Sequence, residues 1–65
     1  MNQNQNRSRI EEAIHALADE AGRLLNAARA NSGIGYHDAA VRCHDAASVA
    51  IQARESLMMF LAATR

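Results

Sequence analysis

The segment 39–61 carries two apolar stripes side by side and contains neither glycine nor proline. Residues in each stripe recur at alternating steps of three and four, so each stripe lies on one face of an α-helix. The first stripe contains Ala39, Cys43, Ala46, Ala50, Ala53, Leu57 and Phe60. The second contains Ala40, His44, Ala47, Ile51, Arg54, Met58 and Leu61. One neighbouring helix covers one stripe, so the pattern predicts a helix that needs two neighbours.

An earlier segment has a single stripe with the same spacing, formed by Ile10, Ile14, Leu17, Ala21, Leu24 and Ala28. Ser8 and Glu11 have the spacing of a capping box, which predicts a helix over about residues 9–31 with Glu11 in its first turn. Asp19 and Arg23 are predicted to pair at i,i+4 spacing. Residues 1–7 are polar apart from Met1, and we expect a disordered tail there.

The cluster of helix-breaking residues between the two segments is Asn31-Ser32-Gly33-Ile34-Gly35. Gly33 suits the left-handed position that ends a helix, and Ile34 suits the apolar contact that follows it. A loop this short, residues 32–35, forces the helices to run antiparallel. The predicted fold class is therefore all-α, with one domain over residues 8–65: an antiparallel hairpin whose second helix covers about residues 36–63.

The unmatched stripe predicts self-association. A chain of 65 residues buries little apolar surface on its own. Two hairpins that place their second stripes together form a four-helix bundle, and twofold symmetry is the commonest arrangement for such a pair. We therefore expect a homodimer. Its predicted interface consists of Ala40, His44, Ala47, Ile51, Met58 and Leu61.

Charge and composition narrow the classes of partner. Seven basic residues balance seven acidic ones, and there are two aromatic residues, so long-range attraction to nucleic acid and stacking on bases are both weak. The start of the chain lacks the apolar core of a signal peptide. The longest strongly apolar run, 57–63, is far short of the ~20 residues that span a bilayer. With the lone thiol of Cys43, this predicts a soluble cytoplasmic protein.

Four residues are suspects for metal or nucleophilic chemistry: His15, His37, Cys43 and His44. None of them has a neighbour among the four at the i,i+3 or i,i+4 spacing of helical metal sites. Cys43 lies on an apolar stripe, where it is expected to be a small core residue rather than a nucleophile. We therefore expect no enzyme activity, no metal and no cofactor. An alternative that stays open is a metal or small-ligand site formed by His44 and Cys43 at the dimer axis.

Residues outside the seams suggest a binding surface. Met59 and Val49 are expected to be partly exposed. Exposed methionine adapts to different partners, and the alternative is that the methionine-rich end of the helix seals the dimer core. Arg54 interrupts an apolar stripe. It is expected to lay its stem along the bundle or to form a structural ion pair with Glu55 or with Asp19 of another chain, and the alternative is a binding hot spot. With the outward Arg42, these residues form the predicted partner-binding set. The predicted function is a homodimeric protein-binding module that acts as an inhibitor or adaptor.

A short helical hairpin that dimerises resembles the plasmid-encoded Rop proteins and very short phage proteins that disable a host or defence protein by binding it. The likeness concerns size and shape, and no motif is shared. It implies either a phage- or plasmid-encoded inhibitor or, as an alternative, a Rop-like nucleic-acid binder. The basic residues available for the alternative are Arg7, Arg9, Arg23 and Arg29.

Overall fold

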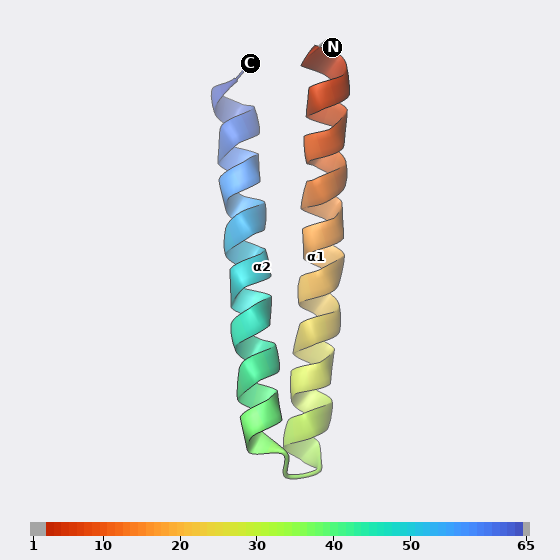
Figure 1. Ribbon diagram of the computed structural model, residues 1–65, viewed down its shortest axis with the longest axis vertical. Coiled ribbons are helices and arrows are strands. Elements are labelled where there is room, and N and C mark those ends of the chain that lie inside the picture. Colours follow the sequence, from red (N-terminus) through yellow and green to blue (C-terminus); the bar gives the residue numbers. More distant parts are fainter. Residues whose placement is uncertain (1–2, 65) are drawn as a thin grey trace.

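The computed structural model describes residues 3–64, which form two helices, α1 (Gln3–Gly33) and α2 (His37–Ala63). The helices pack antiparallel along their whole length, with both chain ends at one end of the molecule (Figure 1). The hairpin is long and narrow, with extents of 49 × 16 × 13 Å. The all-α hairpin predicted from the hydrophobic pattern is confirmed. Met1 and Asn2 of the expected tail, and Arg65 at the end of the expected domain, lie outside the described residues.

The seam between the helices takes one row of residues from each. On α1 it is the predicted stripe from Ile10 to Ala28, and every residue of that stripe is buried or half-buried. On α2 it draws on both predicted stripes and consists of Ala40, Cys43, Ala47, Ala50, Arg54, Leu57 and Leu61. Alternating steps of three and four in both rows are typical of a two-helix seam. Helix α1 thus packs on the boundary between the two stripes of α2 and covers about half of each stripe.

Alanine forms the buried centre of the seam. The buried hydrophobic residues are Ala21, Ala28, Ala47 and Ala50, and no larger side chain in residues 5–64 is fully buried. Small side chains let two helix backbones approach closely. Figure 1 shows the helices closer together near the loop than at the open end, where the seam holds isoleucine and leucine.

The first helix begins at Gln3, well before the expected start near Arg9. Ser8 and Glu11 therefore lie within α1, and the predicted capping box is wrong. The helix also includes most of the segment expected to be a disordered tail. This first part contacts the end of α2, where Nη1 of Arg7 donates a long hydrogen bond of 3.5 Å to the carbonyl oxygen of Leu61. That contact puts a cation at the C-terminal end of α2, where the helix dipole favours positive charge.

The loop uses the predicted kind of helix stop, but at a different glycine. Gly33 is the last residue of α1, and the left-handed residue is Gly35, with φ of 87°. The N–H of Tyr36 donates to the carbonyl of Asn31 at 2.8 Å, and the N–H of Gly35 donates to that of Ser32 at 3.1 Å. These two bonds define a Schellman motif. Ile34 makes no apolar capping contact of the kind predicted, since it is 68% exposed.

Alanine substitutions at the two glycines should have opposite effects. Gly35→Ala forces a side chain into the left-handed conformation and should destabilise the hairpin by about 1 kcal/mol. Gly33→Ala replaces a helical glycine whose added Cβ would meet nothing within 4 Å, so it should stabilise by up to about 1 kcal/mol. Thermal unfolding followed by circular dichroism should show melting temperatures about 4–8 °C below and above that of the wild type. A shift of the same sign in both variants would contradict the assignment of Gly35 as the helix stop.

Candidate functional site

Two lateral faces flank the seam, and the first is referred to here as the isoleucine face. Residues seven apart share a helix face, so this face includes Ala18, Gly22, Leu25 and Arg29 of α1 and Val41, His44, Ser48, Ile51 and Met58 of α2. A shallow groove of about 320 Å³ joins the two rows near the loop, between Arg29 and Ser32 on one side and Val41 and His44 on the other. Leu25 and Ile51 are half-buried, whereas Val41, His44 and Met58 are exposed. The face therefore leaves large apolar side chains in contact with water.

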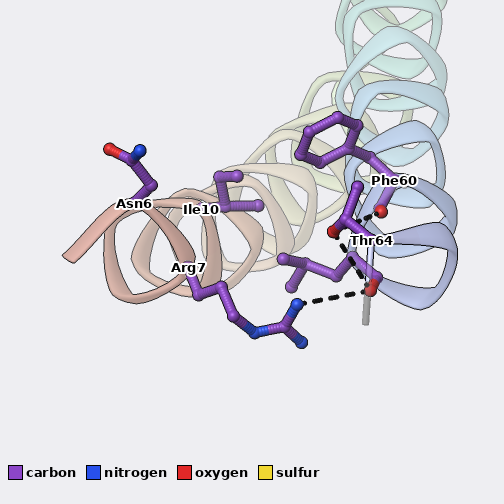
Figure 2. A pocket seen from close by; sticks show the side chains of 6 residues that line it. Asn6, Arg7, Ile10, Phe60 and Thr64 are labelled. Atoms are coloured by element: carbon purple, nitrogen blue, oxygen red, sulfur yellow. Dashed lines mark hydrogen bonds between the residues drawn. The ribbon is translucent and has the colours of Figure 1, made fainter. Parts of the chain in front are cut away.

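The opposite side is referred to as the alanine face. It includes Ala13, Glu20 and Ala27 of α1 with Ala39, Ala46, Ala53 and Phe60 of α2. At the open end of the hairpin it meets a groove of about 200 Å³, which Asn6, Arg7, Ile10, Phe60, Leu61 and Thr64 line. Figure 2 shows Arg7 extending from α1 to the last turn of α2 at this groove. There the hydroxyl of Thr64 donates to the carbonyl oxygen of Phe60 at 3.0 Å. The Arg7 guanidinium and the Thr64 hydroxyl thus donate to carbonyl oxygens in the last turn of α2.

The structure divides the six predicted dimer-interface residues between two places. Ala40, Ala47 and Leu61 belong to the seam, and Ala47 has an exposed fraction of 0%. His44, Ile51 and Met58 lie on the isoleucine face, where a further molecule can reach them. The second stripe is therefore only partly free, because α1 occupies its inner edge.

The four predicted partner-binding residues do not form one surface. Arg42, Val49 and Met59 lie on the outer side of α2, away from α1, and Met59 and Val49 are 72% and 66% exposed. Arg54 lies on the opposite side of the helix, within the seam. Its Nε is buried and has no hydrogen-bond partner among the described residues. A buried donor without a partner costs about 1–3 kcal/mol, so Arg54 is held at an unsatisfied site.

The residues considered for metal or nucleophilic chemistry are separated. His15, His37 and His44 are exposed, and Cys43 is half-buried in the seam. Within the part of the chain that the structure describes, no three His, Cys, Asp or Glu residues are placed to hold a metal ion.

Two of the four arginines considered for nucleic-acid binding already have partners. Arg7 binds the carbonyl oxygen of Leu61, as described above. Arg23 forms an ion pair with Glu20 instead of the predicted pair with Asp19, and its Nε donates to Glu20 at 3.2 Å. The hydrogen bond to Glu20 and the charge of that carboxylate raise the pKa of Arg23. Because a carboxylate lies against Arg23, its charge is less available to a phosphate.

Some exposed apolar residues were not identified from the sequence. Val41 and Phe60 are 58% and 52% exposed, and Ile34 and Tyr36 are exposed at the loop. Phe60 belongs to the first predicted stripe and was assigned to a buried seam. The sequence did contain a signal that Phe60 is exposed. Helix α1 has only one apolar stripe, so it can cover only the residues along the boundary between the two stripes of α2.

No protein-family model matches the chain, and neither a curated protein nor a solved structure is significantly similar to it. Neither α1 nor α2 has a stretch that is long and apolar enough to cross a bilayer, as judged over the described residues. Function is therefore inferred from the surfaces of the hairpin.

Proposed function

We propose that the hairpin is a homodimeric protein-binding module that acts as an inhibitor or adaptor of another protein. The observation that carries the proposal is the area left exposed. The chain exposes 4956 Å², whereas a compact monomer of this size exposes about 4,000 Å². The excess is close to the ~800 Å² that one partner buries in a standard interface. Its radius of gyration of 15.0 Å likewise exceeds the ~11 Å of a compact domain of this length.

The exposed side chains favour protein over nucleic acid as the further partner. Val49 and Met59 are exposed on the outer side of α2. Phe60, the next residue after Met59, is exposed on the alanine face. Apolar side chains of this kind bind protein surfaces, and methionine fits several shapes. Charge is balanced over the chain, so phosphate gains no long-range attraction. The Rop-like alternative is not favoured by any of these features.

Arg54 adds a chemical preference to the proposal. Its guanidinium lies among apolar seam residues, and its buried Nε lacks an acceptor. Because α1 covers the seam, a carboxylate from a partner protein could reach this nitrogen only where the two helices separate, and it would then form a charge-assisted bond. Arginine in such a position contributes strongly to binding when it is paired. An acidic side chain is therefore the expected counterpart of Arg54.

The symmetry of the proposed dimer fits an inhibitor or adaptor. A homodimer presents the outer side of α2 twice, so it can cover one site or bridge two molecules. This mode of action needs no catalytic group. The lone thiol of Cys43 suits a reducing compartment such as the cytoplasm.

A charged residue at Met59 should abolish capture of the partner. Met59→Asp places a carboxylate at the most exposed of the large apolar side chains that the structure describes, which should lower affinity at least roughly tenfold without unfolding the hairpin. The measurement is quantitative pull-down from a lysate of the source organism with tagged protein. Asn26→Asp, an exposed change on α1, is the matched control. If every protein captured by the wild type is also captured by Met59→Asp, the outer side of α2 is not the binding surface.

A further inference from the structure

We propose that the isoleucine face binds the same face of a second copy turned end for end, so that α1 lies on α1 and α2 lies on α2. The inference rests on the homodimer proposed above and specifies its face and orientation. Three features of the isoleucine face carry it: a glycine at its middle, an apolar row along it, and opposite charges at its two ends.

Gly22 lies in the interior of α1 and is exposed. An added Cβ there would meet nothing within 4 Å, so the packing of the hairpin does not require a glycine. A helix-interior glycine nevertheless costs about 1 kcal/mol relative to alanine. Ala18 lies one turn before it, and Ser48 belongs to the row of α2 on the same face. This small-residue centre lets the backbone of another helix come close.

Apolar side chains on both sides of this centre match one another after the end-for-end turn. With Gly22 over Gly22 of the second copy, antiparallel α1 helices bring Leu25 to the level of Ala18 of the second copy. Antiparallel α2 helices bring Met58 to within about one helical turn of Val41 of the second copy. Large side chains thus meet small or exposed apolar ones, as knobs-into-holes packing requires. The exposed area of Val41 and Met58 would be covered in this way.

The charges select the orientation. The end of the face away from the loop carries Glu11 and Glu55 together with His15, whereas the loop end carries Arg29 and His44. In the end-for-end dimer, Arg29 comes within reach of Glu11 of the second copy, and Glu55 within reach of His44 of the second copy. A dimer with the same ends together would place the carboxylates of Glu11 and Glu55 near each other and would leave Arg29 without a carboxylate across the interface. Like charges across an interface are unfavourable, so the end-for-end arrangement is preferred.

A larger residue at position 22 tests the face. Gly22→Gln should improve the helix, because glutamine is a better helix former, yet it should separate the two copies. Sedimentation equilibrium should show a dimer dissociation constant at least roughly tenfold weaker than that of the wild type. Ala30→Gln, an exposed change on the other side of α1, is the matched control and should leave the constant within about threefold.

Charge reversal tests the orientation. At low salt, Glu11→Arg and Arg29→Glu should each weaken the end-for-end dimer by about three- to tenfold, and the double variant should recover most of the loss. In a dimer with the same ends together, Glu11→Arg would strengthen association instead. The effects should diminish in high salt because exposed charges are screened.

The outcomes separate this inference from the proposed function. A wild-type chain that stays monomeric at about 100 µM, well above typical homodimer dissociation constants, overturns both the homodimer and the face assigned to it. A wild-type dimer that Gly22→Gln leaves intact overturns the face but not the homodimer. A dimer that Gly22→Gln disrupts and Glu11→Arg strengthens overturns the orientation. Weakening by Gly22→Gln and by both single reversals, with recovery in the double variant, supports the whole inference.

Discussion

Ala47→Asp should unfold most of the protein at room temperature. Ala47 is the most completely buried residue of the seam, with an exposed fraction of 0%. A carboxylate there would be buried among the small apolar residues of the seam, and burying it costs at least about 3 kcal/mol. Small single-core domains rarely have more than about 3–5 kcal/mol of stability in total. The helical signal in far-ultraviolet circular dichroism should therefore fall to a minor fraction of the wild-type value.

The neighbouring residue provides the matched control. Ala46→Asp makes the same chemical change one position earlier, at an exposed site on α2. It incurs the same loss of helix propensity, at most about 0.7 kcal/mol, but buries no charge. Its melting temperature should stay within about 6 °C of the wild type. If Ala46→Asp and Ala47→Asp melt alike, the row of α2 that faces α1 has been assigned incorrectly.

The sequence predicted the helices well because their signals are local. Alternating steps of three and four defined the stripe from Ile10 to Ala28, and its burial follows the prediction. The glycine cluster predicted a loop at residues 32–35, and the helices of the structure leave residues 34–36 as the connection. It could not distinguish Gly33 from Gly35 as the left-handed residue, because either glycine adopts that conformation without strain. The start of α1 was missed for a different reason: the hydrogen bond from Arg7 to Leu61 is a tertiary contact that no local pattern contains.

The candidate site could be predicted only in part, since it depends on which side of α2 faces α1. The two apolar stripes of segment 39–61 are almost equally regular, and the second one is predicted as a whole to form the dimer interface. In the hairpin, α1 lies between the stripes, which buries Ala47 and leaves His44 exposed. Arg54 is a second residue whose environment could not be predicted from the sequence. Its place in an apolar stripe was visible in the sequence, but the unsatisfied Nε depends on three-dimensional packing.

The melting temperature of the wild type should rise with protein concentration. If folding of the thin alanine core is coupled to association, mass action stabilises the dimer by RT times the logarithm of the concentration ratio. A hundredfold increase, from about 1 to about 100 µM, is worth about 2.7 kcal/mol per dimer. This should raise the melting temperature by about 5–10 °C, because each kcal/mol shifts a protein of the size of the dimer by ~2–4 °C. Differential scanning calorimetry and circular dichroism together cover this range.

Gly22→Gln is the informative comparison for this concentration series. The variant keeps the seam of the hairpin and removes the close approach proposed for the second copy, so its melting temperature should be nearly independent of concentration. It should also be lower than that of the wild type at high concentration, although glutamine favours the helix. A wild-type melting temperature that does not change across the series would mean that four buried alanines and the half-buried residues of the seam stabilise the hairpin alone. The exposed isoleucine face would then be free to bind a different protein.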